Sequence, residues 1–305
     1  MMKIRNSSFL LFLSILMNVA GCNNSDSPSD TPTTGELTIV SDEAFHPLLD
    51  TQVATFNSIY TYAKVKVIYD TEAGAFNELM NDSVRLIVTS RSFSNEELEE
   101  FRKWEIVPKI TKIAYDAVAV ISNKNQNDST ISLIQLKSLL TGQQADGFEN
   151  FRVVFDNNGS GIISYLNNKL GIHNLSKNCF ALNSNSSVIN YVANNKNCIG
   201  LIGVNWISDK DDSSHLNFLK EIKVVEVSET DSSETFKPYQ AYIAQKIYPL
   251  IREVYLLSRE AYTGLATGFT AFVASERGQR IILKQGLVPA TMPVRLVELV
   301  EDEEL

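Results

Sequence analysis

The stretch RVVFDNNGSGIISYLNNKL, residues 152–170, decides the fold that this sequence predicts. It starts as a β-branched and aromatic run, breaks at DNNG, and resumes with apolar residues at helical spacing from Ile162 to Leu170. The pattern therefore predicts a strand, a tight loop and a helix start. Free N–H groups and the helix dipole favour an anion there, and the Ser160 hydroxyl adds a donor. Alternatively, this is an ordinary turn in which Asp156 and Ser160 only cap the helix.

Two glycines, Gly159 and Gly161, stand on either side of Ser160. Because glycine has no Cβ, the backbone at these positions can come close to a bound ligand. We therefore expect Asp156, Gly159, Ser160 and Gly161 to form one wall of a ligand site.

Strands and helices alternate in the chain before this stretch. Three strand-like runs, residues 36–40, 64–69 and 84–88, each lead into a segment with helical spacing. This β-α-β order with short connections favours a mainly parallel sheet covered by helices. The quoted stretch belongs to a second series of the same kind, so the sequence predicts two α/β units.

Polar side chains follow the end of each of the three runs. They are Ser41 and Asp42, then Thr71, and then Ser90 and Arg91. Ligands of open α/β sheets bind at the carboxyl ends of strands, so we expect these residues to face the Gly159–Gly161 loop. The alternative, helix capping, accounts for Thr71 but poorly for Arg91, because a cation at a helix start opposes the dipole.

The donors expected for a small anion are Ser90, Arg91, Ser160 and the backbone of Gly161. Arg91 is expected to contribute most, because it is the only cation at these motifs and a guanidinium presents a fixed fork of donors.

Two longer apolar runs, residues 112–121 and 247–257, separate the two series. They suggest a pair of hinge strands that connect two lobes. The predicted division assigns residues 36–111 and 247–305 to lobe I and residues 112–246 to lobe II.

Composition excludes several classes of protein. The chain has 305 residues, 44% of them hydrophobic, which suffices for one large core or two ordinary ones. A formal charge of −9 argues against nucleic-acid binding, because no basic patch is available. Its three histidines are scattered, so the sequence signals neither a metal cluster nor a general base, and no cofactor is expected.

The N-terminus has the features of an export signal. Lys3 and Arg5 precede a short apolar run, and the sequence VAGC that follows resembles the bacterial lipobox. We expect residues 1–21 to be a signal peptide and Cys22 to carry the lipid anchor, which places the protein in the cell envelope on its periplasmic or outer side. Residues 22–35 contain no apolar side chain beyond Cys22 and are expected to be a flexible tether. A soluble secreted protein is the alternative.

Two further cysteines, Cys179 and Cys198, lie beside apolar strand-like runs. An export compartment permits a disulfide, but buried free cysteine is common, so the sequence leaves their pairing open.

The chain resembles the phosphate-binding substrate-binding proteins of ABC transporters, in their lipoprotein form. Five motifs carry the likeness: Ser90-Arg91 after a strand, residues 116–121 (DAVAVI) in a crossing strand, Gly159-Ser160-Gly161 opening a helix, residues 199–203 (IGLIG), and residues 248–250 (YPL) with Gly278-Gln279 and residues 286–289 (GLVP). The resemblance implies a type II periplasmic-binding-protein fold: two α/β lobes, each a mostly parallel sheet flanked by helices, with two hinge crossings. It also implies a monomer that captures a tetrahedral oxyanion, phosphate above all, for an ABC permease.

The ligand motif departs from the family in two places. Asp156 and Ile162 stand where the family usually has an arginine and a threonine. With Asp42 and Glu72, Asp156 adds carboxylates to the crevice, and desolvated like charges near an anion are costly unless protonated or paired.

Two other functions stay open. A surface adhesion or sensor lipoprotein that keeps the binding fold without transporting phosphate would account for the extra carboxylates. A serine hydrolase would use Ser160, but the chain has Asn158 where the G-x-S-x-G pattern requires glycine.

Overall fold

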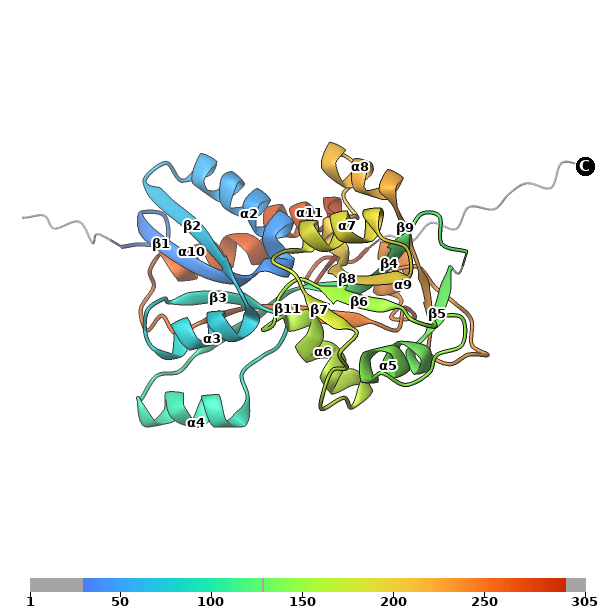
Figure 1. Cartoon of the computed structure of the whole chain (residues 1–305). Helices are drawn as coiled ribbons and strands as arrows, with labels where there is room; N and C mark the ends of the chain where they lie inside the picture. Colours follow the sequence, from blue (N-terminus) through green and yellow to red (C-terminus); the bar gives the residue numbers. More distant parts are fainter. Residues whose placement is uncertain (1–29, 128, 295–305) are drawn as a thin grey trace, which may run out of the picture.

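One long strand, β4 (Lys109–Asn123), runs through both halves of the computed structural model, which describes residues 30–127 and 129–294 (Figure 1). Residues Lys109–Ala117 pair antiparallel with β11 (Ile251–Ser258), and Val118–Ser122 pair antiparallel with β8 (Cys198–Gly203). The strand therefore changes its partner at Val118. We use lobe I for the side of β11 and lobe II for the side of β8.

Lobe I is built on the strand order β2-β1-β3-β11-β4. Strand β1 (Gly35–Asp42) lies parallel to β2 (Ala63–Asp70) and β3 (Leu86–Thr89), β11 is antiparallel to β3, and β12 (Val288–Pro289) pairs with β4. Its helices are α2 (His46–Ile59), α3 (Glu72–Met80), α4 (Asn95–Lys103), α10 (Leu265–Ala274) and α11 (Glu276–Lys284), with the 3₁₀ turn η1 (Glu43–Phe45) after β1.

Lobe II continues the sheet in the order β4-β8-β6-β7, with β6 (Arg152–Phe155) parallel to both β8 and β7 (Cys179–Ala181). Strand β9 (Ile222–Val224) pairs with β4, and β5 (Thr130–Ser132) pairs with β10 (Glu226–Ser228). Its helices are α5 (Leu133–Thr141), α6 (Gly161–Leu170), α7 (Asn185–Asn194), α8 (Ser213–Glu221) and α9 (Gln240–Ala244), with the 3₁₀ turn η2 (Val204–Trp206) after β8.

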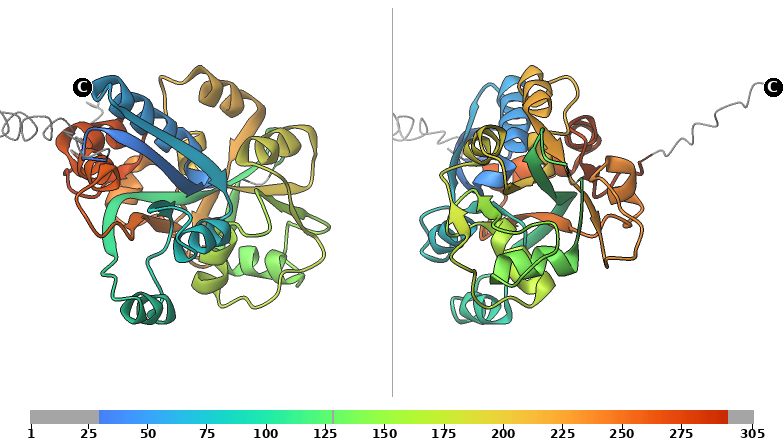
Figure 2. Two further views of the ribbon diagram at one scale, coloured as in Figure 1. Left: turned by 90° about the vertical axis from the view of Figure 1, so that its left-hand side faces the viewer. Right: turned by 45° about the vertical axis from the view of Figure 1, so that its right-hand side comes forward.

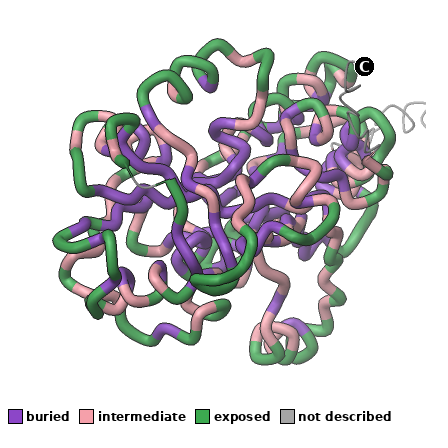
Figure 3. Tube along the Cα trace, turned by 90° about the vertical axis from the view of Figure 1, so that its right-hand side faces the viewer, coloured by how far each residue is buried: buried purple, intermediate pink, exposed green. Residues whose placement is uncertain are grey.

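Alternating side chains of β1 bury both faces of the lobe I sheet. Leu37 and Ile39 join the core under α2 and α10, which extends without a break into lobe II. Val40 points the other way, into a smaller core with Phe76 of α3 and Phe101 of α4. Figure 2 shows helices on both faces of the sheet, and the buried trace in Figure 3 follows the central strands.

The predicted two-lobed α/β architecture is confirmed, with parallel pairing in the outer strands and antiparallel pairing at the crossings. The predicted lobe boundary between residues 111 and 112 falls inside the part of β4 that pairs with β11. A single apolar strand carries no signal for the point at which its partner changes. At that point Val118 accepts a hydrogen bond from the Tyr248 hydroxyl (2.8 Å) and donates one to Leu250 O (2.9 Å), so both predicted crossings meet there.

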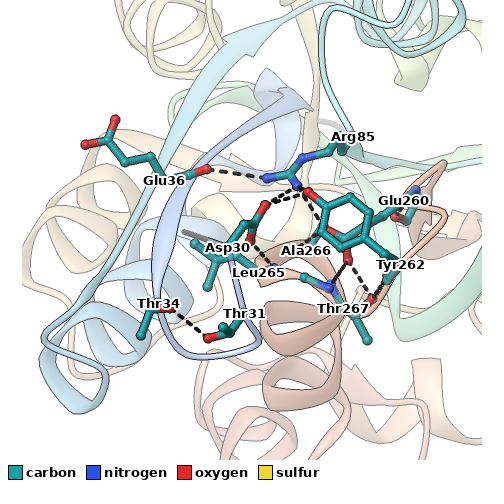
Figure 4. A network of polar contacts seen from close by, with 12 residues as sticks. Asp30, Thr31, Thr34, Glu36, Arg85, Glu260, Tyr262, Leu265, Ala266 and Thr267 are labelled. Carbon is teal, nitrogen blue, oxygen red and sulfur yellow. Dashed lines mark hydrogen bonds and ion pairs between the residues drawn. The ribbon is translucent and has the colours of Figure 1, made fainter. Parts of the chain in front are cut away.

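The expected tether is shorter at its C-terminal end than the composition suggests, because Asp30 docks onto lobe I (Figure 4). The Asp30 carboxylate accepts hydrogen bonds from the Leu265 backbone N–H (2.8 Å) and the Tyr262 hydroxyl (2.7 Å), and it forms an ion pair with Arg85. These partners are distant in sequence, so composition alone could not reveal them. Gly35, the last residue of the expected tether, already belongs to β1.

The expected signal peptide and Cys22 lie outside the described residues, as does the acidic C-terminal end of the chain. Within residues 30–127 and 129–294, no helix has the length and hydropathy needed to span a bilayer.

Candidate ligand-binding site between the lobes

The helix start predicted from the quoted stretch faces lobe I. Ser160 caps α6, its hydroxyl accepting from the Ile162 N–H (3.1 Å), and the Gly161 N–H donates across the lobes to Asp42 Oδ2 (3.0 Å). A Cβ on Gly161 would lie 2.2 Å from that oxygen, so this close approach requires glycine. The helix start therefore binds a carboxyl oxygen here, and that oxygen belongs to Asp42.

A second acidic side chain accepts hydrogen bonds from Ser90, which follows the end of β3. Glu72 Oε2 accepts hydrogen bonds from the Ser90 N–H (2.7 Å) and hydroxyl (2.6 Å). The same Cβ on Gly161 would lie 2.9 Å from Ser90 Oγ and 3.0 Å from Glu72 Oε2. Strand β3, helix α3 and helix α6 thus converge at one point between the lobes.

The two loops beside this point are also in contact. Thr71 caps α3, its hydroxyl accepting from the Gly74 N–H (2.9 Å), as its position after the strand predicted. A Cβ on Gly159 would lie 2.7 Å from Thr71 Cβ, so the loop before α6 packs directly against this cap. Gly159 N–H donates to Asn157 Oδ1 (3.0 Å), which keeps the loop tight.

Asn185, at the start of α7, connects further acidic groups. Its backbone N–H and its Nδ2 donate to Glu43 Oε2 of lobe I, at 3.0 and 2.5 Å. Nδ2 also lies 3.5 Å from Asp156 Oδ2, and Asn185 Oδ1 accepts from the Gly203 N–H (3.2 Å). Asn185 therefore bridges the two lobes beside the start of α6.

A buried ion pair lies between the crossing strands. Arg252 of β11 donates from Nε to Asp116 Oδ2 of β4 (2.8 Å), with Nη2 at 2.7 Å from the same oxygen. Its guanidinium carbon lies 4.8 Å from the centre of the Phe45 ring. Both side chains of the pair are fully buried.

Burial dominates the protonation of these acids. It raises the pKa of Asp42 well above its usual range, with the charges of Asp156 and Glu72 acting in the same direction and Arg252 opposing them. It also raises the pKa of Asp156 and of Asp116, and it raises that of Glu43 to about 7. In each case the charged form loses its hydration without gaining a full set of partners. The site therefore favours protonated acids over a cluster of free charges.

Most of the residues predicted for the site meet between the lobes: Asp42, Thr71, Ser90, Asp156, Gly159, Ser160 and Gly161. Ser41 is buried, but its hydroxyl donates to the carbonyl of Asp42 (3.0 Å). In the sequence, these residues were recognisable because they follow strand ends or belong to the loop with Gly159 and Gly161.

The structure places Arg91 differently from its predicted role as the principal cation. Its Nη1 and Nη2 donate to the two oxygens of Glu97, each at 2.8 Å, and its guanidinium carbon lies 3.4 Å from the centre of the Phe76 ring. Ser92 O accepts a further bond from Nη1 (3.0 Å). Arg91 is thus held by lobe I, because the Glu97 that completes the α4 capping box with Ser94 also attracts the guanidinium.

Sequence reasoning missed Arg252 as a charged group of the site and missed the roles of Glu43 and Asn185. A signal existed for Arg252: it and Asp116 are among the few charged residues that interrupt the two apolar crossing runs. For Asn185 no local pattern distinguishes it from an ordinary first residue of a helix.

Among the described residues, no group of three or more histidine, cysteine or acidic side chains is arranged to hold a metal ion. Cys179 and Cys198 are both free thiols, and β6 separates the two strands that carry them.

Comparison with known proteins agrees with this architecture. The model of the PBP superfamily domain matches residues 26–277. The phosphate-binding protein PstS of Borreliella burgdorferi is 24% identical over 305 aligned positions, which cover 94% of this chain and 99% of the relative.

Two solved structures share the fold. One is a proposed phosphate ABC transporter substrate-binding protein from Clostridium perfringens with bound phosphate, with a TM-score of 0.71, 21% identity, and coverage of 84% of this chain and 100% of that one. The other is an ABC-type phosphate transport receptor from Vibrio cholerae, with a TM-score of 0.64, 18% identity and the same coverage. Because the family model spans most of the chain, from the N-terminal segment through both lobes to α11, this protein belongs to the PBP superfamily.

Proposed function

We propose that this chain is an extracytoplasmic solute-binding lipoprotein that captures a tetrahedral oxyanion, phosphate in the first instance, for an ABC transporter. The observation that carries the proposal is that the Gly161 N–H and both donors of Ser90 bind carboxylate oxygens at one point between the lobes. Donors that hold carboxylates in this structure can hold phosphate oxygens instead. The names of the Borreliella, Clostridium and Vibrio relatives support phosphate as the ligand.

The carboxylates determine which form of the anion this site prefers. Hydrogen phosphate has acceptor oxygens for Ser90 and Gly161, and its hydroxyl can donate a hydrogen bond to a carboxyl oxygen of Asp42 or Glu72 once these side chains are displaced from those donors. Sulfate carries no proton at neutral pH, so it has no hydroxyl to donate to these carboxyl oxygens. We therefore expect phosphate to bind more tightly than sulfate.

Ligand entry requires the two lobes to separate. In this structure they touch through Asp42–Gly161, Glu43–Asn185 and the Trp206 indole N–H, which donates to Ala44 O (3.1 Å). Lobe I, which includes residues 109–117 of β4, and lobe II would open about the crossings near Val118. Small-angle scattering with and without phosphate should show a smaller radius of gyration with ligand than for the ligand-free open state.

The decisive experiment is calorimetric titration of the chain lacking residues 1–21 with phosphate and with sulfate. We expect phosphate to bind and Gly161→Ala to weaken binding at least tenfold, because the added Cβ would lie 2.2 Å from the present position of Asp42 Oδ2, where the proposal places an oxygen of the anion. Ser164→Ala, on the exposed side of α6, is the matched control and should bind as the wild type does. Absence of phosphate binding by the wild type would refute the proposal.

A surface adhesion or sensor lipoprotein remains the second candidate function. It is favoured by the carboxylates of Asp42 and Glu72, which already satisfy the anion donors. If the wild type binds neither anion while remaining folded, this candidate replaces transport. A hydrolase receives no such support: the Ser160 hydroxyl is used as a helix cap, and the family is one of solute-binding proteins.

The proposed partners follow from the same assignment. Cys22 would carry the lipid that holds the protein, as a monomer, at the periplasmic or outer side of a membrane, and an ABC permease would receive the anion. The docked Asp30 would then keep lobe I within eight residues of the anchor.

A further inference from the structure

Arg252 is a buried cation whose hydrogen-bonding capacity is only partly used. One oxygen of Asp116, Oδ2, accepts a hydrogen bond from Nε and lies within ion-pair distance of Nη2. Neither Nη1 nor Nη2 has a hydrogen-bond acceptor of good geometry in the part of the chain that the structure describes, although Nη2 keeps its ion-pair contact, and the side chain is fully buried. A guanidinium has five N–H donors, and a buried donor without a partner destabilises the folded chain. The ion pair with Asp116 therefore does not by itself explain why this position holds arginine.

A second polar side chain without partners lies next to it. Asn205, in η2 of lobe II, has neither a donor nor an acceptor for its buried side-chain amide among residues 30–127 and 129–294. A Cβ on Gly203 would lie 2.7 Å from Asn205 Oδ1 and 3.1 Å from Arg252 Nη2, so both groups lie directly beside Gly203. Two adjacent buried groups, one from each lobe, thus have unused hydrogen bonds.

Gly203, and with it this pair of groups, lies next to the proposed anion site. Gly203 donates to Asn185, whose amide lies beside Glu43 and Asp156. The positive charge of Arg252 also opposes the rise in the pKa of Asp42 and of Asp156 that burial causes, which places the guanidinium within electrostatic reach of both acids. Arg91, in contrast, is committed to Glu97.

We propose that Arg252, assisted by the Asn205 amide, supplies the positive charge that binds the captured oxyanion, with Asp116 as the residue that positions the guanidinium. The inference rests on the proposed function and adds a residue that determines affinity. An oxygen of the anion accepts a hydrogen bond from the free Nη1, while Ser90 and the Gly161 N–H donate to its other oxygens. The anion then approaches Arg252 from between the lobes, and its hydroxyl donates a hydrogen bond to a buried carboxyl oxygen.

A purely structural role, in which Arg252 only joins β11 to β4, is the alternative to be tested. Arg252→Gln alone would leave Asp116 as an unpaired buried charge and could unfold the chain. The informative comparison is therefore between Asp116→Asn and the double variant Asp116→Asn/Arg252→Gln, which contains neither charge. Arg280→Gln, at an exposed arginine of α11, is the matched control for loss of one positive charge.

Phosphate affinity is measured by calorimetry, and thermal unfolding is measured without ligand. We expect the double variant to bind at least tenfold more weakly than Asp116→Asn, since a hydrogen bond to a charged group is worth about 1.5–3 kcal/mol. Asn205→Ala should weaken binding about fivefold, and Arg280→Gln should leave it unchanged. Equal affinity of the double variant and Asp116→Asn would overturn the inference.

Arg252→Lys keeps the charge but not the fork of donors, so it remains informative if the double variant fails to fold. We expect weaker phosphate binding with little change in the unfolding temperature, whereas a structural role predicts a lower unfolding temperature with unchanged affinity. Failure of the wild type to bind phosphate would refute the proposed function itself. Wild-type binding combined with unaffected Arg252 variants would refute only this inference.

Discussion

Replacing Glu43 with glutamine should make the protein more stable at alkaline pH and leave it unchanged at acidic pH. Glu43 Oε2 accepts two hydrogen bonds from Asn185 across the lobes, and its carboxyl group is largely buried. Burial raises its pKa from the ordinary 4.5 to about 7, although the bonds from Asn185 act in the opposite direction. Glutamine resembles the protonated acid and retains an oxygen that can accept both bonds.

The magnitude follows from the difference between the folded and unfolded pKa values. The folded chain binds the Glu43 proton more tightly than the unfolded chain does, so this contribution to stability is complete below pH 4.5. It is lost as the pH rises through about 7. At roughly 1.4 kcal/mol per pH unit, the free energy of unfolding falls by about 3 kcal/mol over this interval. Glu43→Gln removes this loss, so the variant should match the wild type at pH 5 and exceed it by up to about 3 kcal/mol at pH 8.

Urea unfolding at pH 5, 6, 7 and 8, in phosphate-free buffer and followed by circular dichroism, measures the difference between the two proteins. The other buried acids, including Asp42 and Asp116, titrate in both proteins and largely cancel in this difference. Glu99→Gln, at a half-exposed carboxylate of α4, controls for the change in net charge. A difference between Glu43→Gln and wild type that stays constant from pH 5 to 8, or one that shrinks toward pH 8, would show that this reasoning is wrong.

Three further changes test other contacts. Arg91→Ala should change phosphate affinity less than twofold in calorimetry and cost up to about 1 kcal/mol in urea unfolding, because its partly exposed pair with Glu97 is worth little; a tenfold loss of affinity would restore Arg91 as the principal cation. Asp30→Ala should lower the free energy of unfolding by about 1–2 kcal/mol, because the start of α10 loses its acceptor at Leu265; an unchanged value would argue against docking of this segment. Cys22→Ser should release the protein into the soluble fraction of cells, and retention in membranes after a high-salt wash would exclude the lipid anchor.

The sequence by itself determined the features that depend on neighbours along the chain. Helical spacing after Gly161 predicted α6, and the order of strands and helices predicted the α/β lobes. Thr71 was recognisable as a cap because a cap bonds within its own first turn. Gly159 and Gly161 marked a close backbone approach, although what approaches, Thr71 and Asp42, was not visible.

The tertiary structure alone decided which charged groups meet. The sequence predicted Arg91 as the cation of the site, but in the structure it pairs with Glu97 of α4. Arg252 was only a charged residue within an apolar run in the sequence, whereas the structure pairs it with Asp116 of β4. Asp30 lies in a segment whose composition predicted a tether, but in the structure it binds Arg85 and the Leu265 N–H. Local sequence fixes periodicity and capping because these need only residues within one turn or strand. Arg252 and Asp116, in contrast, are 136 positions apart in the sequence, and the energy of a buried charge depends on partners that only the completed fold brings together.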